Sequence, residues 1–337
     1  MKTLLVTILL ATSMVLNAQR AVEHMQSLSV HVDQISKDTW DYVRQVAKGR
    51  NANKIEKRRV ELANTLKTAG STVARVPGYE GDTSLKDAYG NYLRLCYLSI
   101  NEDYKRIVDM ERIAEESYDA MEAYILLKER VKDKMDSAYA TLDEARDSFA
   151  EKYGIQLIEG EETRLSRKLA NASAVNKYIN KLYLIFYKSA FYEQEMVEAM
   201  SAGNVGDIEQ YRQTVETVTT EGAQKIKELP AFRGDNSLKE ACLEMLSFYQ
   251  QEATKSMPSQ IAFFTKKDRM ETLQRNMEAK KKKDLTQADI DEYNNAITSY
   301  NEAINSFNGS NEMLNKGRAQ NLKKWNKALD SFESKFI

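Results

Sequence analysis

The sequence predicts an all-α fold, with two tandem antiparallel helical bundles derived from an internal duplication. Glycine occurs 13 times and proline 3 times among 337 residues, so the chain has few residues that build tight turns. Apolar residues recur at spacings of three and four through most of the chain, as they do on one face of a helix. A thirteen-residue segment beginning at Val76 recurs 153 residues later. Repetition at that distance indicates two copies of one domain-sized unit.

The amino-acid composition narrows the function classes. Apolar residues make up 42% and charged residues 29% of the chain, which is typical of a folded globular protein. The net charge of −1 provides no basic field for nucleic acid, so no nucleic-acid partner is expected. The only histidines, His24 and His31, lack further ligands at metal-site spacing and are expected on the surface. With no phosphate-binding loop either, we expect no enzyme activity, no cofactor and no metal.

The first eighteen residues predict a secretory signal peptide. Lys2 supplies the positive start, an apolar run follows over residues 3–16, and Ala18 ends the segment before polar residues begin. The apolar run is shorter than the roughly 20 residues that span a bilayer, so no transmembrane segment is expected after cleavage. The mature chain is then exported to the periplasm, the outer surface or the extracellular space. The first bundle is expected over residues 19–158 and the second over residues 159–337.

Helical periodicity justifies the elements in order. In the first half it predicts helices over residues 22–48, 55–73, 85–100 and 111–153, the last ended by Gly154. In the second half it predicts helices over residues 207–228 and 238–257, a break at Pro258, and helices over 259–283, 287–307 and 318–336. Residues 178–192 are apolar on nearly all sides, which predicts a buried helix joining the two bundles.

The repeated segment covers residues 76–88 and 229–241. Its proline ends one helix and its glycine allows a sharp bend. Tyr79 and Phe232 are expected to plug the ends of the bundles as apolar anchors. The offset of 153 is expected to grow only to about 158 near Phe149 and Phe307, through a small insertion.

Three capping boxes are predicted at helix starts. A capping box pairs a hydroxyl side chain with an acidic or amide side chain three residues later. The predicted pairs are Ser84 with Asp87, Ser237 with Glu240, and Thr286 with Asp289.

Two aspartates of the repeat have no capping role in this scheme. Asp82 and Asp235 are therefore candidate binding residues, together with the neighbouring Tyr79 and Phe232. Three roles stay open for the aspartates: a hydrogen bond within the turn, coordination of a cation, or contact with a partner.

Cysteines and a lysine run leave further alternatives open. Cys96 and Cys242 lie among apolar residues and are expected to be buried free thiols. A bridge between the two copies is the alternative, because an exported protein meets an oxidising space. Lys280, Lys281, Lys282 and Lys283 are expected to form a solvated helix end, with contact to an anionic surface as the alternative.

Several segments together resemble a family of exported bacterial surface proteins of unassigned activity. They are the two Gly-Asp-x-Ser-Leu-Lys elements at 81–86 and 234–239 and residues 101–111, 117–124, 157–161, 183–186, 262–267 and 324–327. The resemblance implies an envelope or surface location and an all-helical fold. Asp82, Ser84, Asp235, Ser237, Phe263, Phe264 and Trp325 match its motifs, and the family assigns them no roles.

These observations predict a non-catalytic binding or scaffold module of the cell envelope or surface, with an envelope or surface protein as its partner. The first alternative is a periplasmic protein that binds a small ligand or cation, with Asp82 and Asp235 in a shared cleft. A less favoured alternative is an enzyme of unrecognised type that uses carboxylates and tyrosines. The weakest is peripheral membrane association through the lysine run.

Overall fold

The computed structural model describes residues 17–48, 52–157 and 164–337. Within these ranges helices are the only regular elements apart from two isolated β-bridges, which confirms the all-α class. Residues 1–16 of the predicted signal peptide lie outside the described residues, and residues 17 and 18 begin a helix over 17–29. The signal peptide therefore stays a prediction.

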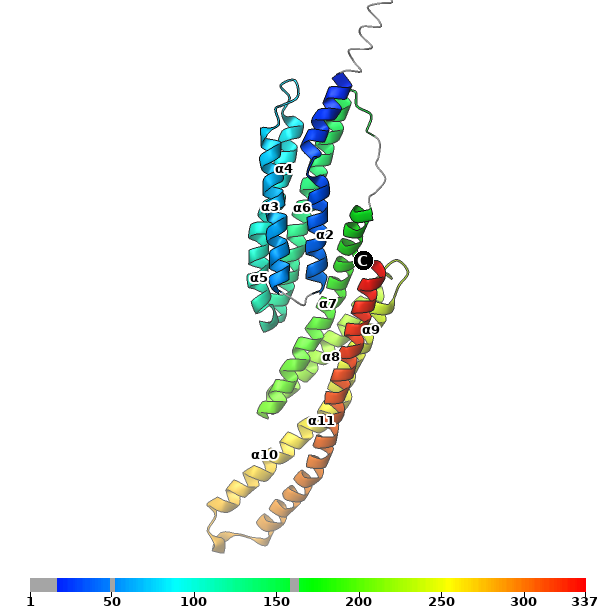
Figure 1. Ribbon diagram of the computed structural model, residues 1–337. Coiled ribbons are helices and arrows are strands. Elements are labelled where there is room, and N and C mark those ends of the chain that lie inside the picture. The colour runs from blue at the N-terminus through cyan, green and yellow to red at the C-terminus, as the bar shows by residue number, and fades with distance from the viewer. Residues whose placement is uncertain (1–16, 49–51, 158–163) are drawn as a thin grey trace, which may run out of the picture. The chain divides into compact units, whose positions relative to one another are not determined.

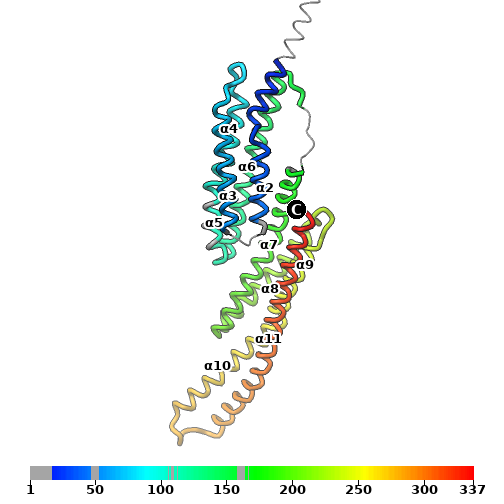
Figure 2. Tube along the Cα trace, viewed as in Figure 1, coloured from blue at the N-terminus to red at the C-terminus, as the bar shows by residue number. Residues whose placement is uncertain are grey.

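The chain divides into two compact units, Met1–Ser173 and Ala174–Ile337 (Figure 2). The division falls inside α7, Arg164–Ala202. The predicted domain boundary between residues 158 and 159 lies earlier, at the start of the undescribed segment 158–163. Each unit has a hydrophobic core of its own.

In the first unit the helices pack in sequence order around one core. Its main helices are α2 (Val32–Lys48), α3 (Ala52–Arg75), α4 (Ser84–Leu98), α5 (Tyr104–Ile113) and α6 (Tyr118–Lys152). α3 packs on α2 and α4, and α6 packs on α4 and α5 (Figure 1). Leu62, Leu85 and Phe149 are fully buried there, and burial of such side chains is the main source of stability.

In the second unit long helices surround a core that includes both aromatic and aliphatic side chains. Its elements are the second part of α7, α8 (Val205–Glu228), α9 (Ser237–Gln251), α10 (Met257–Ala279) and α11 (Gln287–Phe336). Leu182 and Phe186, from the segment predicted to be buried, lie in this core. The Trp325 ring stacks on Phe186 with 5.1 Å between centroids. The further expectation that this segment joins the two bundles stays a prediction.

A five-residue π-helical turn links two helices in each unit. The turn η1 (Ser99–Asp103) connects α4 to α5, and the turn η3 (Glu252–Ser256) connects α9 to α10. The predicted break at Pro258 is wrong, because helix continues through η3 into α10. Pro258 lies in the first turn of α10, where its missing N–H costs least.

Three other helix boundaries differ from the sequence predictions. The helix predicted over 22–48 is interrupted by a turn at residues 30–31. The helix predicted over 111–153 begins at Tyr118, after a short 3₁₀ turn η2 (Ala114–Glu116), because Ser117 is extended and its hydroxyl accepts from the Ala120 N–H at 3.1 Å. The helices predicted over 287–307 and 318–336 are one helix, α11, of 50 residues.

The same element lengths occur in both units at one spacing. α3 and α8 have 24 residues each, α4 and α9 have 15, and η1 and η3 have five; in each pair the second starts 153 residues after the first. After the π-turns the lengths diverge, since α5 has 10 residues and α10 has 23.

The α10–α11 hairpin extends past α7, α8 and α9 in the second unit (Figures 1 and 2). We call residues 265–306 the arm. At its base the rings of Phe263 and Phe307 stack with 4.2 Å between centroids. At its tip the short 3₁₀ turn η4 (Lys282–Asp284) leads into α11.

Two glycines inside α11 have different surroundings. A Cβ added to Gly317 would lie 2.5 Å from Cε2 of Phe248, so the missing side chain allows α9 and α11 to approach closely. A Cβ added to Gly309 would meet no atom within 4 Å. Neither glycine ends the helix.

This contrast predicts opposite effects of one substitution. We expect Gly317→Ala to lower the free energy of unfolding by about 1–3 kcal/mol, because the methyl group forces Phe248 out of place. Gly309→Ala is the matched control and should raise it by about 0.5–1 kcal/mol through helix propensity. Urea unfolding followed by circular dichroism measures both. Equal effects of the two substitutions would contradict the packing role of Gly317.

Candidate functional site

The two repeated corners have the same backbone geometry. Tyr79 and Asp82 exchange two backbone hydrogen bonds of 2.9 and 2.8 Å, and Phe232 and Asp235 exchange two of 3.0 and 2.9 Å. Both residues between each pair have positive φ, as in a tight two-residue turn. Gly81 and Gly234 fill the second of these positions without strain.

Each corner aspartate already has partners. One Asp82 oxygen accepts the Ser84 backbone N–H at 2.9 Å, and the other accepts from Lys152 Nζ at 2.5 Å and from the Tyr153 hydroxyl at 3.2 Å. Asp235 repeats the pattern with the Ser237 N–H at 2.7 Å and Lys335 Nζ at 2.5 Å. Of the three roles that the sequence left open, the structure therefore places these carboxylates in the turn hydrogen bond.

The same partners set the acidity of the corner aspartates. The hydrogen bond from the Lys335 ammonium, followed by those from Ser237, lowers the pKa of Asp235 to about 2. Lys152 and then Ser84 lower the pKa of Asp82 in the same way. Both carboxylates are therefore charged throughout the neutral range.

Two of the three predicted capping boxes are wrong. The helix N-caps are Thr83 and Asn236, and neither side chain accepts a backbone N–H, so Ser84 with Asp87 and Ser237 with Glu240 do not form capping boxes. The side chains of Asp82 and Asp235 accept those first N–H groups instead, two residues ahead, as aspartates do in turns.

The third capping box is confirmed at the start of α11. The Thr286 hydroxyl accepts from the Asp289 N–H at 3.2 Å, and Asp289 accepts from the Thr286 N–H at 2.9 Å. Asp289 also pairs with Lys280 at 2.7 Å, which ties the two helices together at the tip of the arm.

The corner aromatics lie in ring clusters at the ends of the two cores. Tyr79 contacts Phe149 and Tyr153 with centroid distances of 5.8 and 4.8 Å. Phe232 contacts Phe332 and Phe336 at 5.3 and 5.0 Å. Both residues therefore occupy the anchor positions that the sequence predicted.

These contacts correct the predicted offset in the last helix. Phe149 corresponds in its contacts to Phe332, not to Phe307, and Lys152 corresponds to Lys335. The spacing of both pairs is 183 residues, thirty more than the 153 that separates the corners. The expected small insertion is therefore wrong, and the extra residues lie between the π-turn and the last helix, where the arm is.

The histidine and cysteine expectations have separate outcomes. The expectation of a surface His24 is wrong, because its ring is half-buried against Tyr79 and Phe149 at 5.6 and 5.7 Å, and desolvation lowers its pKa. Cys96 and Cys242 are buried free thiols, as predicted, and no disulfide joins them. Burial raises their pKa values to about 11 and 12, which keeps them protonated at neutral pH.

A buried cluster of charged residues in the second unit escaped the sequence analysis. Arg318 of α11 donates from Nε to Glu193 of α7 and from Nη2 to Glu252, the first residue of η3. Its remaining amino group donates to Asn315 at 2.7 Å. Glu252 is 1% exposed and Glu193 is 6% exposed. We call these three charged residues the buried triad.

The triad has one cation for two carboxyl groups. Burial raises the pKa of Glu252 to about 8, the negative charge of Glu193 raises it further, and Arg318 opposes both. Burial raises the pKa of Glu193 as well. The second oxygen of Glu252 has no hydrogen-bond partner among the described residues, so this carboxyl group is the natural place for a proton. With that proton bound, one negative charge faces one positive charge.

Fully buried polar atoms without partners occur at two further places in the π-turn region. Gln260 is 0% exposed, and neither its amide nitrogen nor its amide oxygen has a partner among the described residues. Ser99, which lies 153 residues before Glu252, also has a buried hydroxyl without a partner in that set. Buried polar atoms of this kind are the usual sites of internal water.

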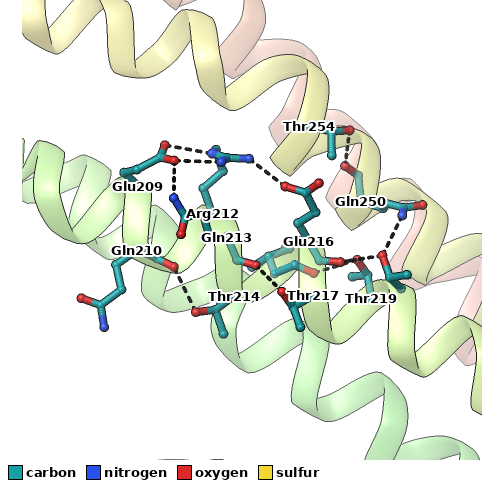
Figure 3. A network of polar contacts seen from close by, with 12 residues as sticks. Glu209, Gln210, Arg212, Gln213, Thr214, Glu216, Thr217, Thr219, Gln250 and Thr254 are labelled. Atoms are coloured by element: carbon teal, nitrogen blue, oxygen red, sulfur yellow. Dashed lines mark hydrogen bonds and ion pairs between the residues drawn. The ribbon is translucent and has the colours of Figure 1, made fainter.

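A second polar network lies on α8 (Figure 3). Arg212 donates two hydrogen bonds of 2.8 Å to Glu209 and one of 3.0 Å to Glu216. In the first unit Arg59 makes the same pair of bonds to Glu56, but its third donor reaches the Ile100 carbonyl inside η1 at 3.0 Å. Arg59 thus stabilises a π-turn directly, whereas Arg212 stabilises its own helix.

Neither a metal cluster nor a membrane span emerges from the described part of the chain. In that part no three histidine, cysteine, aspartate or glutamate side chains gather closely enough to hold a metal ion. None of the helices described there combines the length and apolar character that crossing a bilayer requires. Comparison with family models, curated proteins and solved structures found no match to this chain.

A signal for the triad was present in the sequence. Cys242, Met245 and Tyr249 form a stripe at helical spacing, and the next position on it is Glu252. A carboxylate on an apolar stripe indicates a buried charge that needs a partner. The partners, Glu193 and Arg318, come from distant helices, so sequence spacing alone could not identify them.

The Asp235–Lys335 pair predicts a loss of stability on acidification. The folded pKa lies below the ordinary value, so the contribution is present above about pH 4 and is lost as pH falls toward 2. We expect Asp235→Asn to lower the free energy of unfolding by about 1 kcal/mol at pH 7, because Lys335 is well exposed. Thermal unfolding at pH 2–7 measures this. The exposed Glu244, paired with Lys324, provides the control substitution Glu244→Gln, which should have little effect.

The buried triad predicts the opposite pH dependence. Between the ordinary pKa of 4.5 and the folded value of about 8, the folded state holds an extra proton on Glu252. The free energy of unfolding therefore falls as pH rises through this window, on the order of 3 kcal/mol in total. We expect Glu252→Gln to remove this slope and to be more stable than wild type at pH 8–9. Glu216→Gln, on the surface of α8, should keep the wild-type slope.

Removal of the cation provides the reciprocal check. Arg318→Met leaves two buried carboxyl groups without a cation and should cost about 3–5 kcal/mol at pH 8, and less at pH 5 where they bind protons. Urea unfolding at both pH values measures this. An equal cost at both would contradict the proton-sharing arrangement of the triad.

Proposed function

We propose that the chain is an exported cell-envelope or surface protein that acts as a non-catalytic binding or scaffold module. We further propose that two tandem antiparallel bundles, derived from an internal duplication, form its body. The observation that carries the functional proposal is the arm, which the second unit has in addition to the corners, π-turns and anchors common to both units.

The duplication proposal rests on matched geometry. The corners, the π-turns and the helices on either side recur at a spacing of 153 residues, and the terminal anchors recur at 183. An insertion of thirty residues in the second copy, which lengthens α10 and α11 into the arm, accounts for both spacings. The body then needs no contribution from the arm to close its core.

The arm has the properties of an interaction element. Its residues are all described, and only Ala296 and Ala303 among them are buried. Ile290 is 36% exposed, and Met313 on the next part of α11 is 71% exposed. A helical pair that buries so little of itself presents most of its surface to other molecules. The buried triad fixes α11 to the body next to the base of the arm.

The alternative of cation binding at Asp82 and Asp235 has less support, because a lysine ammonium already occupies one oxygen of each carboxylate. Contact of the arm tip with an anionic surface has one supporting feature, since Lys281, Lys282 and Lys283 are exposed. A protein partner is favoured over this, because the acidic first half of α11 runs beside the lysine run.

An arm deletion tests the proposal. We expect replacement of residues 268–298 by a short Gly-Asn-Gly turn to leave Tm within a few degrees, because the core around Trp325 and Phe332 is retained. In intact cells, cross-linking should join the wild-type chain to envelope proteins and should not join the deleted chain. A control with Lys281, Lys282 and Lys283 replaced by alanine should cross-link like wild type.

The outcomes separate the alternatives. Unchanged cross-linking after the deletion would contradict an arm-based function. Loss with the alanine control alone would favour an anionic surface. Protease treatment of intact cells with fractionation, done first, tests export itself, and a chain found with the cytoplasmic fraction would overturn the proposal.

A further inference from the structure

We infer that the arm pairs with the arm of a second copy of this chain, α10 beside the partner's α11, to form a four-helix bundle. This inference deepens the proposed function, since it names a partner for the arm, and it rests on that proposal only in treating the arm as an interaction element. Two independent features of the arm support it: an incompletely buried apolar seam and a separation of charge between its helices.

The apolar seam runs along the inner faces of both helices. Its partly buried members are Met270, Leu273, Met277 and Leu285 before the turn, and Tyr293, Ile297, Tyr300 and Ile304 after it. Two helices cover only one side of such a seam, whereas four helices enclose it completely. The small residues Ala296 and Ala303 let the two helices lie close and leave the larger side chains at the edge.

Charge is divided between the two halves of the arm. Residues 265–284 carry eight basic and four acidic side chains, and residues 285–306 carry four acidic and no basic ones. Within the arm, Arg269 pairs with Glu292 at 3.3 Å and Lys280 with Asp289 at 2.7 Å.

Other arm charges remain for a partner. Lys266 and Arg275 before the turn, and Asp291 and Glu302 after it, make no ion pair among the described residues. They provide two basic and two acidic side chains on a hairpin that is otherwise closed by its own pairs.

A second copy satisfies this charge pattern better than other occupants do. A two-fold axis between two arms places each basic helix beside the partner's acidic helix, so both helices gain opposite charges. A polyanion such as nucleic acid or an anionic membrane would match α10 and be repelled by α11. The 16 residues of α10 from Phe264 to Ala279 give a contact about 24 Å long, enough for three to four layers of seam side chains.

The mature full-length chain tests the inference directly. Light scattering and sedimentation over a range of concentrations should give the mass of a dimer that dissociates on dilution. A mixture of ¹⁴N and ¹⁵N protein treated with a zero-length carbodiimide cross-linker should give mixed-isotope links between Lys266 or Lys267 and Asp291 or Glu302. A monomer at all concentrations, or mixed links confined to other regions, would overturn the inference. Single-isotope links from the arm to the first unit would show that the chain covers its own arm.

Charge exchange provides a sharper test. One variant, Lys266→Glu with Arg275→Glu, makes both helices acidic, and the other, Asp291→Lys with Glu302→Lys, makes both basic. Each alone should weaken dimerisation at least ten-fold, and an equimolar mixture should restore it, because every basic helix then meets an acidic one. No recovery in the mixture, with helicity by circular dichroism unchanged in each variant, would contradict the proposed pairing.

The two proposals fail in distinguishable ways. Dimerisation without arm-dependent cross-linking to the envelope would support the inference and contradict the proposed function. Arm-dependent cross-linking by a chain that stays monomeric would do the reverse.

Discussion

An arginine buried between two glutamates determines how the second unit holds its longest helix. Arg318 lies on α11, and its two partners come from α7 and from the π-turn after α9. Apolar stripes on long helices pack nearly as well after a shift of one or two turns, whereas a guanidinium between two carboxyl groups permits one register. Such a cluster costs desolvation energy, and the register it fixes is the compensating gain. The proton on Glu252 reduces that cost, because it lets one net negative charge face one positive charge. The position of the arm depends on this register, since α11 carries half of it.

The corners apply a similar constraint at the other end of each unit. A turn with two residues at positive φ directs an aromatic ring into the end of the core and an aspartate toward the last helix. Lys152 and Lys335 then join the last helix of each unit to the start of α4 or α9. The bonds are of modest strength because both lysines are exposed. Their consequence is geometric: the ends of the helices that enclose the core stay together, and the rings of Tyr79 and Phe232 stay covered.

Local chemistry explains which features the sequence predicted correctly. The all-α class, the free thiols of Cys96 and Cys242, the aromatic anchors and the Thr286 capping box depend on composition or on neighbours a few residues apart. The boxes at Ser84 and Ser237 failed because Asp82 and Asp235 compete for the same N–H groups from two residues upstream. The triad and the 183-residue spacing could not be predicted, since each is defined by contacts between helices far apart in sequence. Phe307 resembles Phe149 in its local sequence, and only the ring contact with Phe232 identifies Phe332 as its counterpart.

An insertion of thirty residues into a helical hairpin is tolerated only if both helices keep their inner faces aligned. Divided between two helices, it adds about fifteen residues to each, which is close to four turns and about 22 Å of length. Four turns return the apolar seam to nearly the same face, so the Phe263–Phe307 stack and the core beneath it need not change. The added length buries little by itself, because it extends beyond α7, α8 and α9, which could otherwise cover it. A hairpin of that kind gains stability from a partner that supplies the missing half of a four-helix core, and its basic and acidic helices favour a partner with the same two helices in the opposite order.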